Sequence, residues 1–269
     1  MTAAAWLHRH VGARLALLLA APLTWLIAVY LAPLGLLFLT AFWQTDSFTG
    51  LVQRRLTTAN FVDVFTEPAY LTALARTVGV ALVVTLACIV IGLPMALFMA
   101  KVAAPRWQPV LLALVLTPLW ASYLVKVYAW RTILGATGGL GLGAVVLVLT
   151  YLWLPYMVLP LYTGLTSMRA SLLDAAADLG APPGRVVRTV VLPLLAPSVI
   201  AGSIFTFSLS LGDYITVQLV GGTSQMLGNV VYANFSTDLP FAAAVATLPV
   251  LVMIGYLLAA RRSGALEQL

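Results

Sequence analysis

Six long runs of apolar residues, separated by short polar segments, dominate this sequence. A helix that crosses a bilayer needs about 20 mostly apolar residues. Only 8% of the residues are charged and 62% are hydrophobic, whereas a soluble domain is about 25% charged. We therefore predict an all-α integral membrane protein, one transmembrane domain over 1–269 with about six transmembrane helices. The predicted spans are approximately 15–43, 74–100, 109–130, 142–165, 196–221 and 240–260.

Basic side chains at alternate ends of these runs predict the orientation of the chain. Arg9 and Arg14 precede the first run, and Lys101 and Arg106 lie between the second and third. Cytoplasmic loops of membrane proteins carry an excess of Lys and Arg, so we expect both termini, and the segment 166–195, on the cytoplasmic side. The first run is too long for the apolar core of a signal peptide, so we expect it to remain as a helix. The net charge of +6 then reflects membrane topology, and no nucleic-acid partner is expected.

Few side chains of this sequence could support catalysis or bind a metal ion. The single cysteine, Cys88, lies inside an apolar run, and both histidines, His8 and His10, lie near the N-terminus. No disulfide can form within the chain, and no cysteine-based metal site can be built. The sequence also lacks the G-x-x-x-x-G-K-[ST] phosphate loop of an ATPase. We expect no catalytic residue, no metal site and no cofactor on this chain, and a membrane-embedded enzyme has little support.

The segment 171–193, SLLDAAADLGAPPGRVVRTVVLP, is a charged insert between the fourth and fifth runs. Connections between packed helices usually take about 2–8 residues, so an insert as long as 166–195 calls for a function. Ser171 and Asp174 are typical of a helix start. Gly180 can end that helix by adopting the left-handed conformation. We predict a short cytoplasmic helix whose small side chains allow another surface to approach closely.

The second half of the insert predicts a further short segment. Pro182 and Pro183 stop the first helix and can start the next. Residues 185–191 form one or two amphipathic turns in this interpretation. Pro193 and Pro197 are then expected to redirect the chain into the fifth span.

The insert resembles the signature loop of ABC importer permeases, usually written EAA-x3-G-x9-I-x-LP. The matching pattern is Asp174-Ala175-Ala176-x3-Gly180-x9-Val190-x-Leu192-Pro193, with Asp in place of Glu and Val in place of Ile. The resemblance implies that the short helix of this loop docks into a cytoplasmic ATPase. The coupling residues that it implies are Asp174, Ala175, Ala176, Gly180, Leu192 and Pro193.

The similarity extends beyond the insert. The segments 210–216, 221–222 and 227–229, together with Asn60 and Phe61, resemble the spermidine/putrescine-type branch of these permeases. The resemblance implies a pathway-forming subunit in a bacterial inner membrane. Its expected partners are two cytoplasmic subunits that bind ATP, a second permease that is a different chain, and an extracytoplasmic solute-binding protein. The branch also includes permeases for opines, so the expected solute is a small organic molecule, with a polyamine-like cation as one candidate.

Asp213 is the one acidic residue well inside a predicted span. Charges inside a membrane are costly, so such a residue is a functional candidate. In one interpretation Asp213, with Tyr214 and Tyr123, lines the solute pathway and attracts a cation. In the other, Asp213 pairs with Lys126 or Arg76, or caps local backbone, and is structural. We expect Lys126 and Arg76 themselves to extend toward the outer interface.

An ion-coupled secondary transporter is the main alternative to an ATP-driven importer. Such a carrier needs ion-coupling groups inside the membrane and is often built from internal repeats. The sequence offers one buried carboxylate, Asp213, and no internal repeat. This alternative therefore rests on a single residue.

Overall fold

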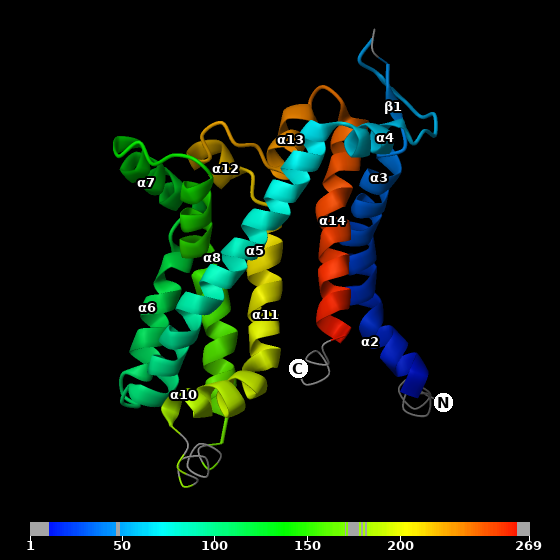
Figure 1. The fold of residues 1–269 in the computed structure, drawn as a ribbon. Coiled ribbons are helices and arrows are strands. Elements are labelled where there is room, and N and C mark those ends of the chain that lie inside the picture. The colour runs from blue at the N-terminus through cyan, green and yellow to red at the C-terminus, as the bar shows by residue number, and fades with distance from the viewer. Residues whose placement is uncertain are drawn as a thin grey trace.

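Long helices lying roughly side by side make up the fold (Figure 1). The computed structural model describes residues 11–46, 49–169, 171, 178, 180 and 182–262. In that part of the chain, five helices are long and apolar enough to cross a membrane, and a bent helix pair can provide a sixth crossing. The five are Leu18–Thr40, Pro68–Val102, Leu142–Ser167, Gly184–Leu211 and Leu239–Arg262, and the bent pair is Gln108–Trp120 with Tyr123–Ala136. The predicted all-α membrane fold with about six spans is confirmed.

The described elements follow one another in this order along the chain. The helices are α2 (Val11–Trp25), the π-helix η1 (Leu26–Leu31), α3 (Ala32–Thr40), α4 (Ala59–Thr66), α5 (Pro68–Leu97), the π-helix η2 (Phe98–Val102), α6 (Gln108–Trp120), α7 (Tyr123–Ala136), α8 (Leu142–Ser167), α10 (Pro183–Val186), the π-helix η3 (Val187–Val191), α11 (Leu192–Leu211), α12 (Ile215–Val220), α13 (Leu227–Asn234) and α14 (Leu239–Arg262). Two short antiparallel strands, β1 (Gln44–Thr45) and β2 (Val52–Gln53), form a hairpin before α4.

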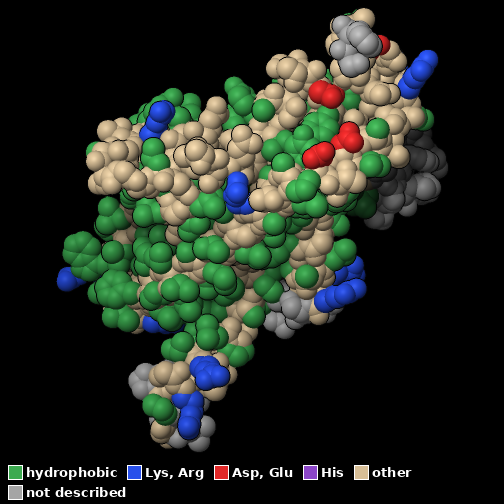
Figure 2. Space-filling view, turned by 45° about the horizontal axis from the view of Figure 1, so that its top comes forward, with side chains coloured by type: hydrophobic (Ala, Val, Ile, Leu, Met, Phe, Trp, Pro, Cys, Tyr) green, Lys and Arg blue, Asp and Glu red, His purple; other side chains and the backbone are tan. Residues whose placement is uncertain are grey.

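The two ends of the bundle differ in what they carry. The start of α2, the end of α14 and helix α10 lie at one end, whereas β1, α4, α12 and α13 lie at the other (Figure 1). Figure 2 shows the Asp and Glu side chains of the visible face gathered at the end that carries α4 and α13. This arrangement matches the predicted orientation, so we call the end with α10 cytoplasmic and the opposite end outer.

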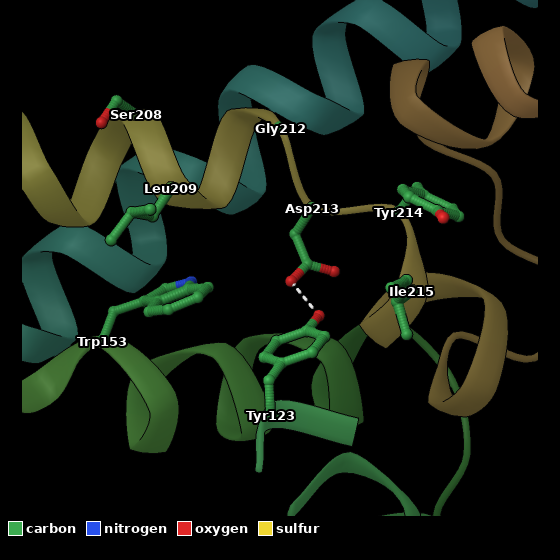
Figure 3. Close-up of a pocket in the computed structure, with 8 residues that line it drawn as sticks. All are labelled: Tyr123, Trp153, Ser208, Leu209, Gly212, Asp213, Tyr214 and Ile215. Carbon is green, nitrogen blue, oxygen red and sulfur yellow. Dashed lines mark hydrogen bonds between the residues drawn. The ribbon is translucent and has the colours of Figure 1, made fainter. Parts of the chain in front are cut away.

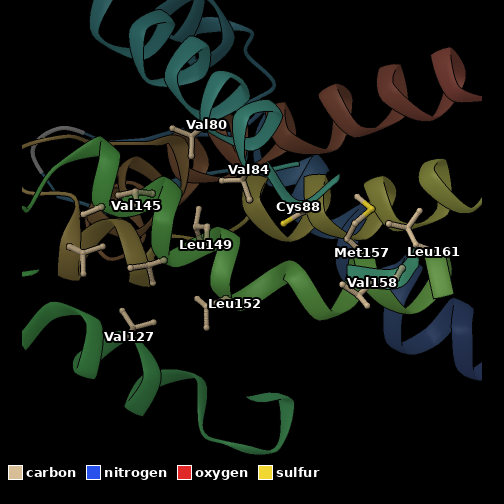
Figure 4. Close-up of a cluster of buried hydrophobic side chains, with 14 of the residues drawn as sticks. Val80, Val84, Cys88, Val127, Val145, Leu149, Leu152, Met157, Val158 and Leu161 are labelled. Atoms are coloured by element: carbon tan, nitrogen blue, oxygen red, sulfur yellow. The ribbon is translucent and has the colours of Figure 1, made fainter. Parts of the chain in front are cut away.

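Helices α5, α8 and α11 pack together around the main core. Buried side chains from α5 and α8, among them Val84, Cys88, Leu149 and Met157, fill the space between them (Figure 4). Helix association inside a membrane relies on close van der Waals packing, which small residues permit. Gly202 of α11 provides such a contact, since a Cβ atom placed there would lie 2.6 Å from Sδ of Met157 and 3.2 Å from its Cα.

Replacing Gly202 with Val should therefore destabilise the bundle. The added methyl groups have no space between α11 and α8, and overpacking of this kind costs about 1–3 kcal/mol. We expect the thermal unfolding midpoint of the detergent-solubilised protein to fall by several degrees. Gly255→Val in α14 is the matched control, because a Cβ atom there has nothing within 4 Å. Equal midpoints for the two variants would contradict the assigned contact.

The fifth membrane helix differs from the sequence-based prediction at both ends. The prediction placed it at 196–221, whereas the structure has one helical segment over Gly184–Leu211. Pro193 and Pro197 do not interrupt the helical segment, since the π-helix η3 precedes Pro193 and α11 continues through Pro197. The chain does change direction there, because α10 lies across the cytoplasmic end and α11 runs from it toward the outer end (Figure 1). A proline removes one intrahelical hydrogen bond, and a π-type turn is a common local adjustment of that ladder in membrane helices.

The third predicted span, 109–130, is not one straight helix. Helices α6 and α7 meet at 88°. Ala121 and Ser122 between them have extended backbone, with ψ angles of 144° and 131°. Hydropathy alone did not reveal this break because the residues on both sides of it are apolar.

Candidate functional site

A pocket of about 330 Å³ opens near the outer end of the bundle, where two helices are interrupted. Helix α7 begins beside it after the bend from α6, and α11 gives way to α12 at residues 212–214. Irregular backbone at membrane depth is tolerated where it is buried in protein or lines a cavity. The lining residues, shown in Figure 3, are Tyr123, Trp153, Ser208, Leu209, Gly212, Asp213, Tyr214 and Ile215.

Asp213 occupies the break between α11 and α12 and is only 7% exposed. Its Oδ1 accepts a hydrogen bond from the backbone N–H of Thr216 at 2.8 Å, which caps the start of α12. Its Oδ2 accepts from the hydroxyl of Tyr123 and, at 3.1 Å, from the hydroxyl of Thr216. These bonds join the first turn of α7 to the break in α11.

The structure places Asp213 just past a membrane helix and not within one, which corrects the prediction. The helix ends at Leu211, and Asp213 lies two residues beyond it. Burial raises the pKa of the Asp213 carboxyl above its usual value, and the hydrogen bonds from Tyr123 and Thr216 lower it in part. A buried carboxylate with neutral donors around it keeps most of its charge uncompensated.

Neither of the two basic residues considered as partners pairs with Asp213. Lys126 donates to the carbonyl oxygen of Pro118 at 2.9 Å, which satisfies a backbone group near the end of α6. Arg76 donates to the carbonyl oxygen of Gln225 at 2.8 Å. The ion-pair version of the structural interpretation is therefore wrong, whereas the local capping that it also proposed is present. Lys126 reaches back to its own bend instead of extending freely toward the interface.

The three predicted pathway residues are only partly brought together. Tyr123 and Asp213 are hydrogen-bonded and face the same pocket (Figure 3). Tyr214 also borders the pocket, but its ring stacks on Tyr232, with centroids 5.0 Å apart. Tyr214 therefore contributes less side-chain surface to the carboxylate than the sequence suggested.

Two further residues of the site carried no role in the sequence analysis. Thr216 stands three residues after Asp213, a spacing typical of a carboxylate that caps a helix start, so this contact could have been found. Trp153 comes from α8 and stacks on Tyr123, with centroids 6.2 Å apart and ring planes 12° apart. No short-range pattern in the sequence connects Trp153 to Asp213.

The predicted coupling loop is described only in part. Gly180 is exposed and has φ of +71°, the left-handed conformation expected for it. Leu192 and Pro193 form the first turn of α11 and are exposed. Asp174, Ala175 and Ala176 lie outside the described residues. The conformation of Gly180 is confirmed, and the coupling roles of all six residues stay predictions.

Comparison with known proteins identifies the family. Residues 89–264, well over half of the chain, match the model of the binding-protein-dependent transport system inner membrane component. The chain is 39% identical to the inner membrane ABC transporter permease protein YdcU of Escherichia coli strain K12, covering 96% of this chain and 92% of that protein. It is 32% identical to the spermidine/putrescine transport system permease protein PotB of the same strain, covering 85% and 90%.

A solved structure supports the fold. The bacterial alginate ABC transporter, crystallised in complex with an alginate pentasaccharide-bound periplasmic protein, contains a chain that superposes with a TM-score of 0.68 at 14% identity, covering 94% of each chain. Together with the sequence matches, this likeness accounts for the helical core and its multi-pass arrangement. The chain is a membrane-spanning permease of the inner membrane, a transport component and not an enzyme, and it belongs to the family of binding-protein-dependent ABC importer permeases.

Proposed function

We propose that this permease carries a small organic cation of the polyamine class, with Asp213 as the charged group of its outer pocket. One relative supports this choice: PotB, 32% identical to this chain, is named for spermidine and putrescine transport. The single observation that carries the proposal is the buried Asp213 carboxylate, which opens on a pocket and whose hydrogen-bond donors are neutral groups.

The chemistry of the pocket suits a cation. A buried carboxylate without a basic partner has lost hydration that it cannot fully recover from neutral donors. A solute ammonium group beside it would supply the missing positive charge. The faces of Tyr123 and Trp153 next to it are electron-rich and also favour a cation.

The importer that we propose includes three kinds of partner. Two cytoplasmic subunits bind and hydrolyse ATP, a second permease of different sequence completes the pathway, and a solute-binding protein delivers the cation from outside. The family description, which specifies binding-protein-dependent transport, supports the last of these. The absence of a phosphate loop from the sequence supports placing ATP on other chains. Membership of this family removes the reason to prefer an ion-coupled carrier.

We propose further that the segment around Gly180 receives the movement of the ATPase. Gly180 is exposed and has the left-handed conformation expected at the end of the predicted docking helix, and residues 184–211 form one helical segment that leads toward the outer pocket. Movement at the cytoplasmic surface would therefore be passed along this helical segment to its outer end, next to Asp213. In this proposal Asp174, Ala175 and Ala176 contact the ATPase, and Leu192 and Pro193 begin the transmitting helix.

The solute class can be tested on the binding protein of the same transport system. We expect thermal-shift screening to show stabilisation of that protein by putrescine or spermidine, and weaker or no stabilisation by amino acids and opines. The loaded protein should then stimulate ATP hydrolysis by the assembled importer. Stabilisation only by anionic or uncharged solutes would contradict the proposal.

A further inference from the structure

Four aromatic side chains continue inward from Asp213. This aromatic row consists of Tyr123 of α7, Trp153 and Tyr156 of α8, and Phe205 of α11. Consecutive ring centroids are 6.2 Å, 6.0 Å and 6.4 Å apart. The first two members line the pocket beside the carboxylate (Figure 3).

The direction of the row follows from the helices that carry it. Trp153 and Tyr156 are three residues apart on α8 and therefore lie on one face of that helix. Helix α8 runs from the outer end toward the cytoplasmic end, so Tyr156 is deeper than Trp153 (Figure 1). Phe205 stands eight residues before Asp213 in the chain, which at about 1.5 Å per residue is roughly 12 Å further inward. The row thus leads from the pocket toward the middle of the membrane.

Trp153 adds an independent sign that the row has a function. Its indole Nε1 is buried and has no hydrogen-bond partner, and it is the one buried side-chain polar atom in this condition among the residues that the structure describes. Leaving such a donor unpaired costs about 1–3 kcal/mol. Tryptophan in membrane proteins usually places its N–H where a partner is available. The contacts recorded for the Trp153 side chain are therefore those of its ring, with Tyr123 and Tyr156, and not a hydrogen bond of its N–H.

We propose that the aromatic row is a second cation-binding subsite below Asp213, with Trp153 as the specificity-determining residue. This inference rests on the proposed function, because it assumes that the solute is an organic cation. An ammonium group interacts favourably with a ring face within about 6 Å of its centroid. Since neighbouring rings are about that far apart, a group that leaves one ring is already within reach of the next. Alkyl segments of the solute would pack on the same faces.

The row would also exclude other solutes. Ring faces carry the negative part of the aromatic quadrupole, and Asp213 stands at the outer end of the row. An anion would therefore be disfavoured at both places. An uncharged solute would gain only apolar contact, so the row selects for a charged head joined to an apolar chain.

The test uses the complete importer in proteoliposomes, with tryptophan at position 153 replaced by analogues that carry one to four fluorines. Fluorination withdraws electron density from the ring face and changes its volume little, so a purely structural role would not respond. With binding protein below saturation, we expect the rate of labelled putrescine uptake to fall with each added fluorine, by about five- to tenfold over the series. Trp153→Leu should lose at least as much, and Trp153→Tyr should recover part of the rate.

The same series at Trp107 is the matched control. Trp107 is exposed and precedes α6 at the cytoplasmic end, so fluorination there should leave uptake unchanged. If the rate of putrescine uptake does not change across the fluorinated analogues at position 153, while the unmodified importer takes up putrescine normally, the proposed subsite is wrong. The proposed function would remain intact. Failure of the unmodified importer to take up any organic cation would instead overturn the proposed function, and this inference with it.

Discussion

Replacing Asp213 with Asn lowers the uptake of an organic cation by at least about tenfold. Two unit charges about 4 Å apart interact with roughly 1 kcal/mol in water and about 4 kcal/mol near a protein surface, and each 1.4 kcal/mol is about a factor of ten. Asparagine has nearly the same shape and retains an oxygen that can accept the N–H of Thr216. The capped start of α12 is therefore expected to remain, so that the variant loses the charge and little else.

The measurement is ATP-dependent uptake by the reconstituted importer, with Asp63→Asn as the matched control. Asp63 lies on α4 at the outer end and is exposed. Removing the charge of Asp63 tests whether uptake depends on outer carboxylates in general. We expect uptake by this control importer to stay close to that of the unmodified importer. Wild-type uptake by the Asp213→Asn importer would assign Asp213 to capping alone and contradict its place in the pathway.

Replacing Gly180 with Val uncouples uptake from ATP hydrolysis. Gly180 has φ of +71°, and an L residue in that conformation costs roughly 1–2 kcal/mol, with a β-branched side chain the least suited. A Cβ atom at this position has nothing within 4 Å, so the effect comes from the backbone and not from crowding within the chain. The helix end would then change shape at the surface proposed to meet the ATPase. We expect uptake to fall at least about tenfold while the variant still inserts and the ATPase subunits still hydrolyse ATP.

Gly184→Val is the matched control for this change. Gly184 is exposed, belongs to α10 and also has open space around its Cβ position, but its φ is not in the left-handed region. The same side chain introduced four residues further along should leave uptake largely intact. Normal uptake together with normal ATPase association in the Gly180→Val importer would contradict the coupling role.

The sequence predicted the membrane helices well where an apolar run coincides with one helix, and poorly where a helix breaks within such a run. The runs 109–130 and 196–221 remain apolar on average across their interruptions, although Asp213 lies in the second one, so a window average of hydropathy does not report either break. At the bend after α6, Lys126 bonds to the carbonyl oxygen of Pro118. The end of α11 coincides with the cap that Asp213 provides for α12. Both are contacts of particular polar side chains, which an average over a window of residues does not detect.

The residues of the candidate site also differ in how far the sequence predicted them. Asp213 stood out in the sequence because a carboxylate in an apolar run is rare and costly. Its contact with Tyr123 joins the break between α11 and α12 to the start of α7, far away in the sequence. The stack of Trp153 on Tyr123 joins α8 to α7. Helical periodicity shows which residues share a face of one helix, but it does not show which faces of different helices meet.

The most direct measurement is solute uptake by proteoliposomes that contain this permease with its partner permease, its ATPase subunits and its binding protein. Putrescine labelled with tritium is supplied outside together with the binding protein, with ATP at the ATPase subunits, and an uncharged diol of the same length serves as the comparison. We predict that putrescine accumulates only when both ATP and the binding protein are present, and that the diol does not accumulate. Uptake that persists without ATP and follows an ion gradient, or accumulation of the diol as fast as putrescine, would contradict an ATP-driven importer of organic cations.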